Sequence, residues 1–251
     1  MGNIKKVGAR GVATKSGRRN KLVKLGSDFY ERPSVVKVAK ELLGKVLVTD
    51  FGGARTSGRI VEVEAYNGVV DRASHAWSGR RTARTEVMFG AGGRAYVYLI
   101  YGIHSLFNVV TNTKDIPHAV LVRALQPLDG IAVMEARMGR VGAQALGRRD
   151  EVRVPGGLDE ASTRAGRTDY SLTRGPGNLS RAMGLMREHT GLSLLGKEIW
   201  IADDGYTVRP SEIVATTRIG VEYAGEDAAL RYRFFLKGNP WVSGPKRLNA
   251  G

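Results

Sequence analysis

The segment GRIVEVEAY, residues 58–66, alternates in polarity with a period of two residues, which is the period of a β-strand. One side of such a strand carries Val61, Val63 and Ala65, and the other carries Ile60, Glu62, Glu64 and Tyr66. The segment is apolar enough to be partly buried. A buried carboxylate requires partners or a chemical role, so the two glutamates constrain both the fold and the function.

Other stretches also have strand character and are separated by short turns: residues 45–51, 94–102, 103–111, 118–125, 198–204, 212–220 and 231–238. Helical spacing predicts one helix with Ser34 as N-cap and Gly44 at its end, a second over 129–138 and a third over 178–191. Many strands joined by short turns favour an α+β fold, with a single compact domain, a curved and mainly antiparallel sheet, and flanking helices.

Composition limits the class of protein. A chain of 251 residues, 42% of them hydrophobic, can bury one core of ordinary size. It has no cysteine, which excludes disulfides, thiolate zinc sites and a cysteine nucleophile, and four scattered histidines predict no metal centre. The most apolar stretch, residues 96–110, is interrupted by Gly102, His104 and Asn108, so we expect no membrane-spanning segment.

The net charge of +15 is concentrated at the N-terminus. Residues 1–26 hold eight lysines and arginines and no acidic residue, which leaves +7 for the rest of the chain. The sequence predicts a disordered basic arm there that contacts phosphate; a merely solvated tail and a cleaved organelle transit peptide are the alternatives. The folded domain is expected over residues 27–251, with a flexible loop rich in arginine and glycine at about 139–171.

Two glycine motifs invite comparison with phosphate-binding loops. GAGGRA, residues 90–95, precedes a strand instead of opening a helix, so we interpret it as a turn. GPGNLSRA, residues 175–182, precedes a helix, and free backbone N–H groups at Gly175, Gly177 and Asn178 could hold a phosphate. An ordinary capped loop explains this second motif equally well.

Tyrosines mark the two strands that meet at Gly102. Tyr96 and Tyr98 share one strand face, where an aromatic residue is more often part of a core than of a ligand platform. Tyr101 stands next to the glycine of a predicted hairpin tip, has little reason to be buried, and is suited to enter a base stack. His104 lies just beyond the tip, and a merely exposed polar residue is an equally good interpretation of it.

These motifs together resemble the 3-methyladenine (alkyladenine) DNA glycosylase family. The similarity runs through FYERPSVVKVAKELLGKVL, GRIVEVEAY, SHAWSGRRTARTEVMF, AYVYLIYGIHSLFNVVT and AVLVRALQPL, resumes at RGPGNLSRAMGL, and ends with IGVEYAGE and RFFLKGNPWVS. It covers residues 27–138 and 172–243, with the motifs in the family's order. The predicted loop at 139–171 is longer than the family pattern.

The resemblance implies a role for each matching residue. Glu64 corresponds to the general base that activates a water molecule, and Arg123 to an arginine near the base and that water. Tyr66 and His75 correspond to residues that pack on and hydrogen-bond the extruded base, and Tyr98 to the residue that stacks on its other face.

Further roles concern selectivity and DNA contact. Asn108 corresponds to an asparagine that crowds the 2-amino group of a normal guanine. Tyr101 corresponds to the wedge of a protruding, DNA-intercalating β-hairpin, and Gly102 and His104 belong to the same DNA-facing hairpin. Glu62 is expected to be a structural or secondary neighbour of the general base.

The family implies a monofunctional base-excision-repair DNA glycosylase without metal, cofactor or Schiff base. Such an enzyme flips alkylated or deaminated purines (3-methyladenine, 7-methylguanine, hypoxanthine or ethenoadenine) out of duplex DNA and leaves an abasic site. We expect double-stranded DNA as its partner, a monomer, and a place in the bacterial cytoplasm at the nucleoid or in a eukaryotic nucleus. The alternatives are a noncatalytic DNA- or RNA-binding protein and a helix-hairpin-helix glycosylase, the latter based on GPGNLSRA alone.

Overall fold

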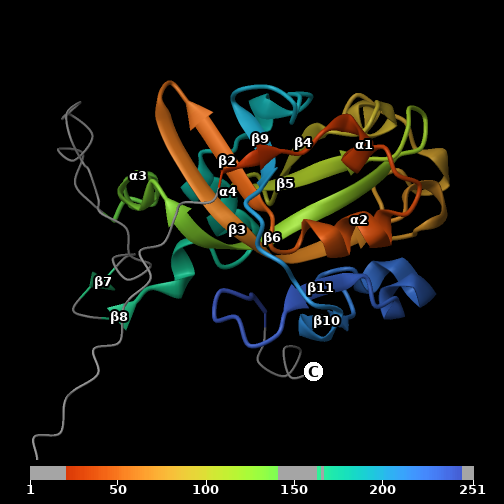
Figure 1. The fold of residues 1–251 in the computed structure, drawn as a ribbon. Coiled ribbons are helices and arrows are strands. Elements are labelled where there is room, and N and C mark those ends of the chain that lie inside the picture. Colours follow the sequence, from red (N-terminus) through yellow and green to blue (C-terminus); the bar gives the residue numbers. More distant parts are fainter. Residues whose placement is uncertain (1–20, 141–162, 165–166, 245–251) are drawn as a thin grey trace, which may run out of the picture.

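The computed structural model describes residues 21–140, 163–164 and 167–244. Its centre is one antiparallel sheet that curls into a half-barrel (Figure 1). The strand order is β1 (Val23–Lys24), β9 (Ile199–Asp203), β2 (Val46–Phe51), β3 (Ala54–Tyr66), β6 (His118–Asp129), β5 (His104–Thr111) and β4 (Arg94–Ile100). A further pair, β10 (Ile213–Thr216) and β11 (Arg233–Leu236), joins the sheet through β3. The predicted α+β class and single compact domain are confirmed.

Strand β3 is the predicted strand around the two glutamates, and it lies in the interior of the sheet. It pairs with β6 along most of its length, and its last part also pairs with β11. Glu64 therefore stands between Leu121 and Arg233 on the two neighbouring strands. β3 is therefore paired on both sides here, and both glutamates on it are fully buried.

One part of the predicted alternation is wrong. Ile60 packs in the main hydrophobic core together with Val61 and Val63, and not beside the glutamates. The pairing of β3 with β6 shifts register between Ile60 and Glu62, which marks a β-bulge. A bulge inserts one residue into the ladder, so the alternation of side chains restarts after it.

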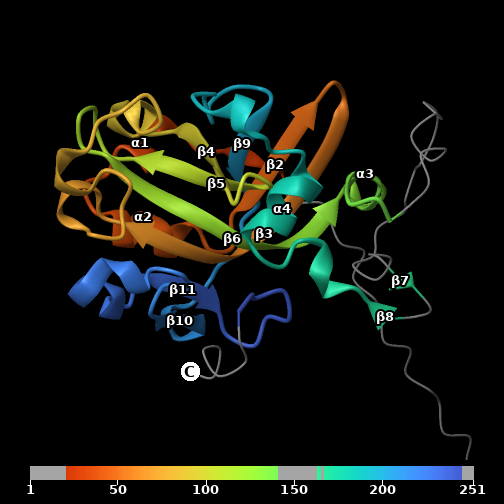
Figure 2. The same cartoon turned by 180° about the vertical axis from the view of Figure 1, so that it is seen from behind.

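Helix α2 (Val35–Leu42) follows its sequence signals closely. The Ser34 hydroxyl accepts a hydrogen bond from the backbone N–H of Lys37 at 3.3 Å, and Gly44 after the helix has a φ of +85°. Its apolar residues at helical spacing are buried against β3 and β6. Figure 2 shows α4 (Pro176–Met183) beside β5 and β6, which it contacts, while α3 (Ile131–Arg137) packs on α4 and β3.

Other element boundaries differ from the prediction. The helix expected over 178–191 ends at Met183, because Gly184 adopts a left-handed φ of +71° and a separate 3₁₀ turn follows at Arg187–His189. Pro176 at the first helical position begins that helix two residues early. The strand expected over 212–220 is limited to β10. A short helix, α1 (Ser27–Tyr30), was not predicted.

The structure also differs from the prediction at the basic arm and at the loop of residues 139–171. Val23 and Lys24 pair with β9, so the last residues of the predicted basic arm belong to the sheet. Residues 1–20 and most of the predicted loop at 139–171 lie outside the described residues. Within that loop, β7 (Thr163–Arg164) pairs with β8 (Arg167–Thr168), and a 3₁₀ turn covers Tyr170–Leu172.

The GAGGRA motif forms the predicted turn before a strand. Gly92 donates a backbone hydrogen bond to Asn112, and Gly93 has a φ of +82°. A Cβ on Gly92 would lie 2.9 Å from backbone atoms of Tyr30, so close approach of two chain segments requires glycine there. Among the helices of the described ranges, none is long and apolar enough to cross a membrane.

Candidate active site

A cavity of about 760 Å³ opens between the end of β3, the β4–β5 pair, the start of α4 and the segment after β10. Residues from these elements, from β6 and from the loop after β3 line it. They include Tyr66, His75, Tyr96, Tyr98, Tyr101, His104, Asn108, Arg123, Arg174, Gly175, Gly177, Asn178, Ile219 and Tyr223. The structure thus gathers nearly all predicted site residues around one space, although they come from five separate segments of the chain.

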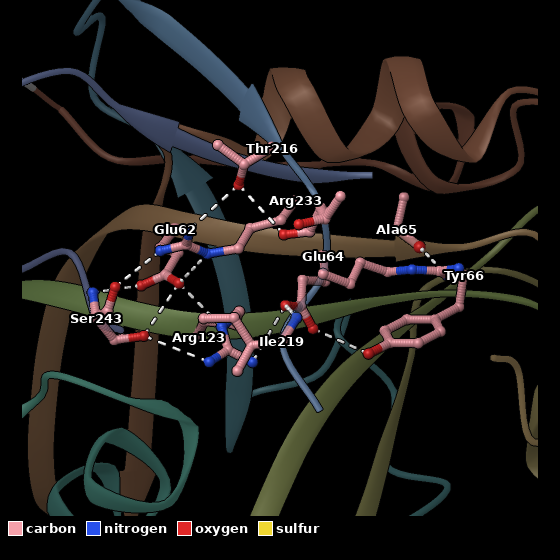
Figure 3. Close-up of polar contacts among 11 residues, drawn as sticks. Glu62, Glu64, Ala65, Tyr66, Arg123, Thr216, Ile219, Arg233 and Ser243 are labelled. Carbon is pink, nitrogen blue, oxygen red and sulfur yellow. Dashed lines mark hydrogen bonds and ion pairs between the residues drawn. The ribbon is translucent and has the colours of Figure 1, made fainter. Parts of the chain in front are cut away.

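Glu64 lies behind the wall of this cavity. Its Oε1 accepts the backbone N–H of Ile219 at 2.8 Å and pairs with Nη1 of Arg123 at 3.3 Å, while its Oε2 accepts the Tyr66 hydroxyl at 2.9 Å (Figure 3). All three partners line the cavity, whereas Glu64 does not. The carboxylate is therefore held in one orientation by three groups that line the cavity.

Glu62 has a different environment, although it is only two residues away on the same strand. It accepts hydrogen bonds from Nε of Arg123 at 2.9 Å, from Nε of Arg233 at 2.8 Å, and from the backbone N–H of Ser243 at 2.6 Å (Figure 3). Burial alone would raise the pKa of Glu62, but Arg123 and Arg233 hold that pKa below its ordinary value. Glu62 is therefore a buried anion that forms ion pairs with two buried arginines.

Arg123 links the two glutamates. Its guanidinium donates to Glu62 through Nε and pairs with Glu64 through Nη1. Burial opposes its charge, but Glu64 and Glu62 together keep the pKa of Arg123 above its ordinary value. The alternating pairing of anion and cation allows three charged groups to remain buried at one place.

Aromatic rings form the cavity wall opposite this charge cluster. Nδ1 of His75 lies 2.8 Å from the Tyr96 hydroxyl, and the His75 ring meets that of Tyr98 edge to face at 4.6 Å. Burial, with Arg84 and Arg80 nearby, lowers the pKa of His75 to about 4, so the ring is neutral at physiological pH. Nη2 of Arg84 lies 3.2 Å from Nε2, which makes Nε2 the acceptor because a guanidinium can only donate.

Tyr66 completes the wall beside Glu64. Burial and the Glu64 carboxylate raise its pKa well above the ordinary value, so it remains a phenol that donates to Glu64. Asn108 is almost fully buried, and its amide nitrogen donates to the backbone carbonyls of Tyr96 and Leu106 at 3.1 and 3.2 Å. These bonds fix the asparagine at the cavity wall.

The turn between β4 and β5 contains Tyr101, Gly102 and Ile103. Tyr101 is 86% exposed and Ile103 is 74% exposed. Tyr101 has a φ of +53°, which is uncommon for a residue with a side chain. Large apolar side chains held in water at a turn have no role in the core, as the sequence predicted for Tyr101.

The GPGNLSRA motif lies against the same turn. Gly175 is the N-cap of α4 with a φ of +89°, and a Cβ on Gly177 would lie 3.2 Å from the ring of His104. The Asn178 side chain donates to the carbonyls of Ser171 and Arg174 at 3.0 and 3.2 Å, so it is used within the protein. The helix-hairpin-helix alternative is wrong, because this motif flanks an antiparallel sheet.

Several site residues were not singled out from the sequence. Arg84 and Arg233 bear the same charge as many surface arginines, and only the fold brings them to His75 and Glu62. Ile219 contributes a backbone N–H, for which its side chain gives no signal. Tyr96 had the correct strand spacing, but so does any core tyrosine. In the part of the chain that the structure describes, no three His, Asp or Glu side chains are grouped to hold a metal ion.

Fold and site define a protein with a curled antiparallel sheet, a tyrosine-lined cavity and a buried carboxylate bonded to groups of the cavity wall. A family model described as methylpurine-DNA glycosylase (MPG) matches residues 28–240. The chain belongs to this family.

The names of similar curated proteins agree with this family. A Clostridium acetobutylicum protein named "Putative 3-methyladenine DNA glycosylase" is 43% identical over 224 residues, covering 88% of this chain and 98% of its own. A protein of the same name from Alkaliphilus oremlandii is 40% identical over 221 residues, which cover 88% of this chain and 99% of the relative. Another, from Bacillus cytotoxicus, is 42% identical over 219 residues, which cover 86% of this chain and 97% of the relative. These relatives are bacterial, so the comparisons give the nuclear alternative no support.

Proposed function

We propose that this protein is a monofunctional DNA glycosylase that excises damaged purines from duplex DNA. The carrying observation is the position of Glu64, a fully buried carboxylate fixed by three groups that line an aromatic cavity. Its substrates are purines of the 3-methyladenine, 7-methylguanine, hypoxanthine and ethenoadenine type. The family and the names of the relatives support DNA as the partner.

The cavity suits an extruded purine. Its volume of about 760 Å³ lies in the range of small-ligand sites, and its lining is rich in aromatic rings on which a base can stack. We place the base between Tyr66 and Tyr98, with His75 at its edge and Asn108 against the 2-amino group of a normal guanine. A neutral His75 does not repel an alkylated purine that carries positive charge.

The proposed reaction is hydrolysis. A water oxygen bonds to C1′ of the extruded nucleotide, one water proton passes to Glu64, and the electron pair of the N-glycosidic bond leaves with the purine. Positive charge develops on the sugar during bond cleavage, and a nearby carboxylate stabilises it. Arg123 holds Glu64 in orientation from the cavity side. Because Tyr66, Arg123 and Ile219 cover the carboxylate, one of them shifts when the nucleotide and water are bound.

The surface around the cavity mouth supplies the DNA contacts in this proposal. Tyr101 enters the base stack that the extruded nucleotide leaves, and Gly102 and His104 form the same DNA-facing turn. Backbone groups at Gly175, Gly177 and Asn178 contact a phosphate. We further propose that the protein acts as a monomer in the bacterial cytoplasm and that it uses no cofactor.

The test is excision from defined duplexes. Purified protein is incubated with duplexes that hold one hypoxanthine or one 1,N6-ethenoadenine and then treated with alkali, and methylated DNA is assayed for free 3-methyladenine. We expect strand breaks at a lesion or release of the methylated base. Absence of all three products would reject the glycosylase and favour the noncatalytic nucleic-acid-binding protein.

A further inference from the structure

A second buried ion pair lies close to Glu64 and has no part in the reaction as described. Nη1 and Nη2 of Arg218 donate to the two carboxylate oxygens of Asp71 at 2.5 and 2.9 Å. Both side chains are removed from solvent almost completely. Such a two-pronged pair fixes the plane and the position of the guanidinium as well as its charge.

Arg218 also contacts other segments. It donates to the backbone carbonyl of Ala65 at 3.0 Å and to that of Asp227 at 3.1 Å. Its guanidinium lies 4.9 Å from the centre of the Tyr66 ring. One side chain thereby ties the end of β3, the loop that carries Asp71 and the 3₁₀ segment Glu222–Ala229 to the chain that follows β10.

These contacts lead directly to Glu64. Ile219 follows Arg218 in the chain, and its N–H donates to Glu64 Oε1, while Tyr66, whose ring Arg218 contacts, donates to Oε2. Arg218 therefore supports two of the three groups that hold the carboxylate. We propose that Arg218, held by Asp71, is a positioning residue that orients Glu64 for attack on the nucleotide; this inference rests on the proposed function.

Arginine is required at this place because four acceptors surround it. Two carboxylate oxygens and two backbone carbonyls are met by the two terminal nitrogens of one planar group. A lysine keeps the charge but has a single nitrogen, so it cannot hold the same geometry. A displacement of about 1 Å in a reacting group lowers rates on the order of 100-fold.

The experiment compares Arg218→Lys and Asp71→Asn with wild type on a duplex that the wild-type protein cleaves. Single-turnover rates are measured at saturating protein, and dissociation constants are measured for the same duplex. We expect each variant to lose on the order of 100-fold in rate, with binding changed by less than about threefold. The double variant should be no slower than the slower single variant, because the pair acts as a unit.

Arg59→Lys is the matched control. Arg59 also makes a two-pronged bond to an aspartate, Asp204, and a bond to a backbone carbonyl, Gly44, but these partners do not line the cavity. We expect a lower melting temperature and an unchanged rate. Should Arg218→Lys fail to fold, Asp71→Asn alone decides. The positioning role is overturned if a folded Arg218→Lys or Asp71→Asn protein cleaves at the wild-type rate, or if Arg59→Lys loses as much rate as they do. An inactive wild-type protein instead rejects the proposed function.

Discussion

At the scale of single residues, the two glutamates of β3 have different environments. All three partners of Glu64 line the cavity, whereas Arg233 and Ser243, which hold Glu62 together with Arg123, do not. A strand pattern places both on one face, but only the neighbouring strands decide which partners each one meets. We therefore expect substitution of Glu62 to lower mainly stability and substitution of Glu64 to lower mainly the rate of excision.

Glu62→Gln should act mainly on stability. It removes the anion that neutralises Arg123 and Arg233, and loss of one member of a buried ion pair destabilises by about 3 kcal/mol. Calorimetry should show a melting temperature lower by about 10 °C. The folded-state pKa of Glu62 is depressed, so its contribution is present above the unfolded pKa and fades as the pH falls below it. A melting temperature equal to that of wild type at pH 7 would contradict this role.

His75 should remain neutral far into the acid range. Its pKa is lowered from 6.5 to about 4, so NMR should show a constant ring shift from pH 8 to 5 and a change near pH 4. Below about pH 6.5 the unfolded chain binds a proton that the folded chain does not, so this group lowers stability progressively down to about pH 4. A midpoint near 6.5 would show that the ring is not enclosed.

At the scale of elements, the sequence predicted the positions of strands and turns better than it predicted which strands pair and in which register. The period of two in GRIVEVEAY predicted β3, and Ser34 with Gly44 predicted α2. The bulge after Ile60 was missed because it depends on pairing with β6, and sequence spacing carries no information on register. Most predicted site residues do line one cavity, because the family motifs preserve their spacing; Ile219 and Arg218 could not be found, since they act through a backbone group and through tertiary contacts.

The β4–β5 turn yields a prediction for that element. Tyr101→Ala should leave the free energy of unfolding within about 0.5 kcal/mol of wild type, because the side chain is exposed. Excision should slow by about tenfold, because the stack around the extruded nucleotide loses its wedge. The measurement is single-turnover excision beside thermal unfolding. Ile103→Ala, at the same turn and also exposed, is the control; equal losses in both variants would argue against a specific wedge.

At the scale of the whole molecule, positive charge and the acidic site are complementary. The chain carries +15, and the glutamates that serve the site are buried among arginines. Charge of this sign gathers DNA phosphates without reading sequence. In the proposed function, the tyrosine-lined cavity then receives the base, so affinity and selectivity would come from different parts of the protein.

The N-terminal segment should contribute to that affinity. Residues 1–20 contain six lysines and arginines and precede β1, so a deletion should end at residue 20 and leave the strand intact. Removal of these residues should weaken DNA binding and reduce the slope of log K against log salt by as much as about 5, while the rate at saturation stays unchanged. Binding measured over a series of salt concentrations checks this. An unchanged slope would assign those charges to solubility alone.

Replacement of Glu64 by glutamine tests whether this carboxylate performs the proposed chemistry at the cavity. Single-turnover excision of hypoxanthine at saturating protein is compared between wild type and Glu64→Gln, with the dissociation constant of the same duplex measured in parallel. The glutamine oxygen can still accept from the Ile219 N–H, and its amide nitrogen can donate to the Tyr66 oxygen, but glutamine is a far weaker base and carries no charge. The predicted result is a rate at least about 100-fold lower with binding retained. A Glu64→Gln protein that excises hypoxanthine at the wild-type rate would contradict the claim.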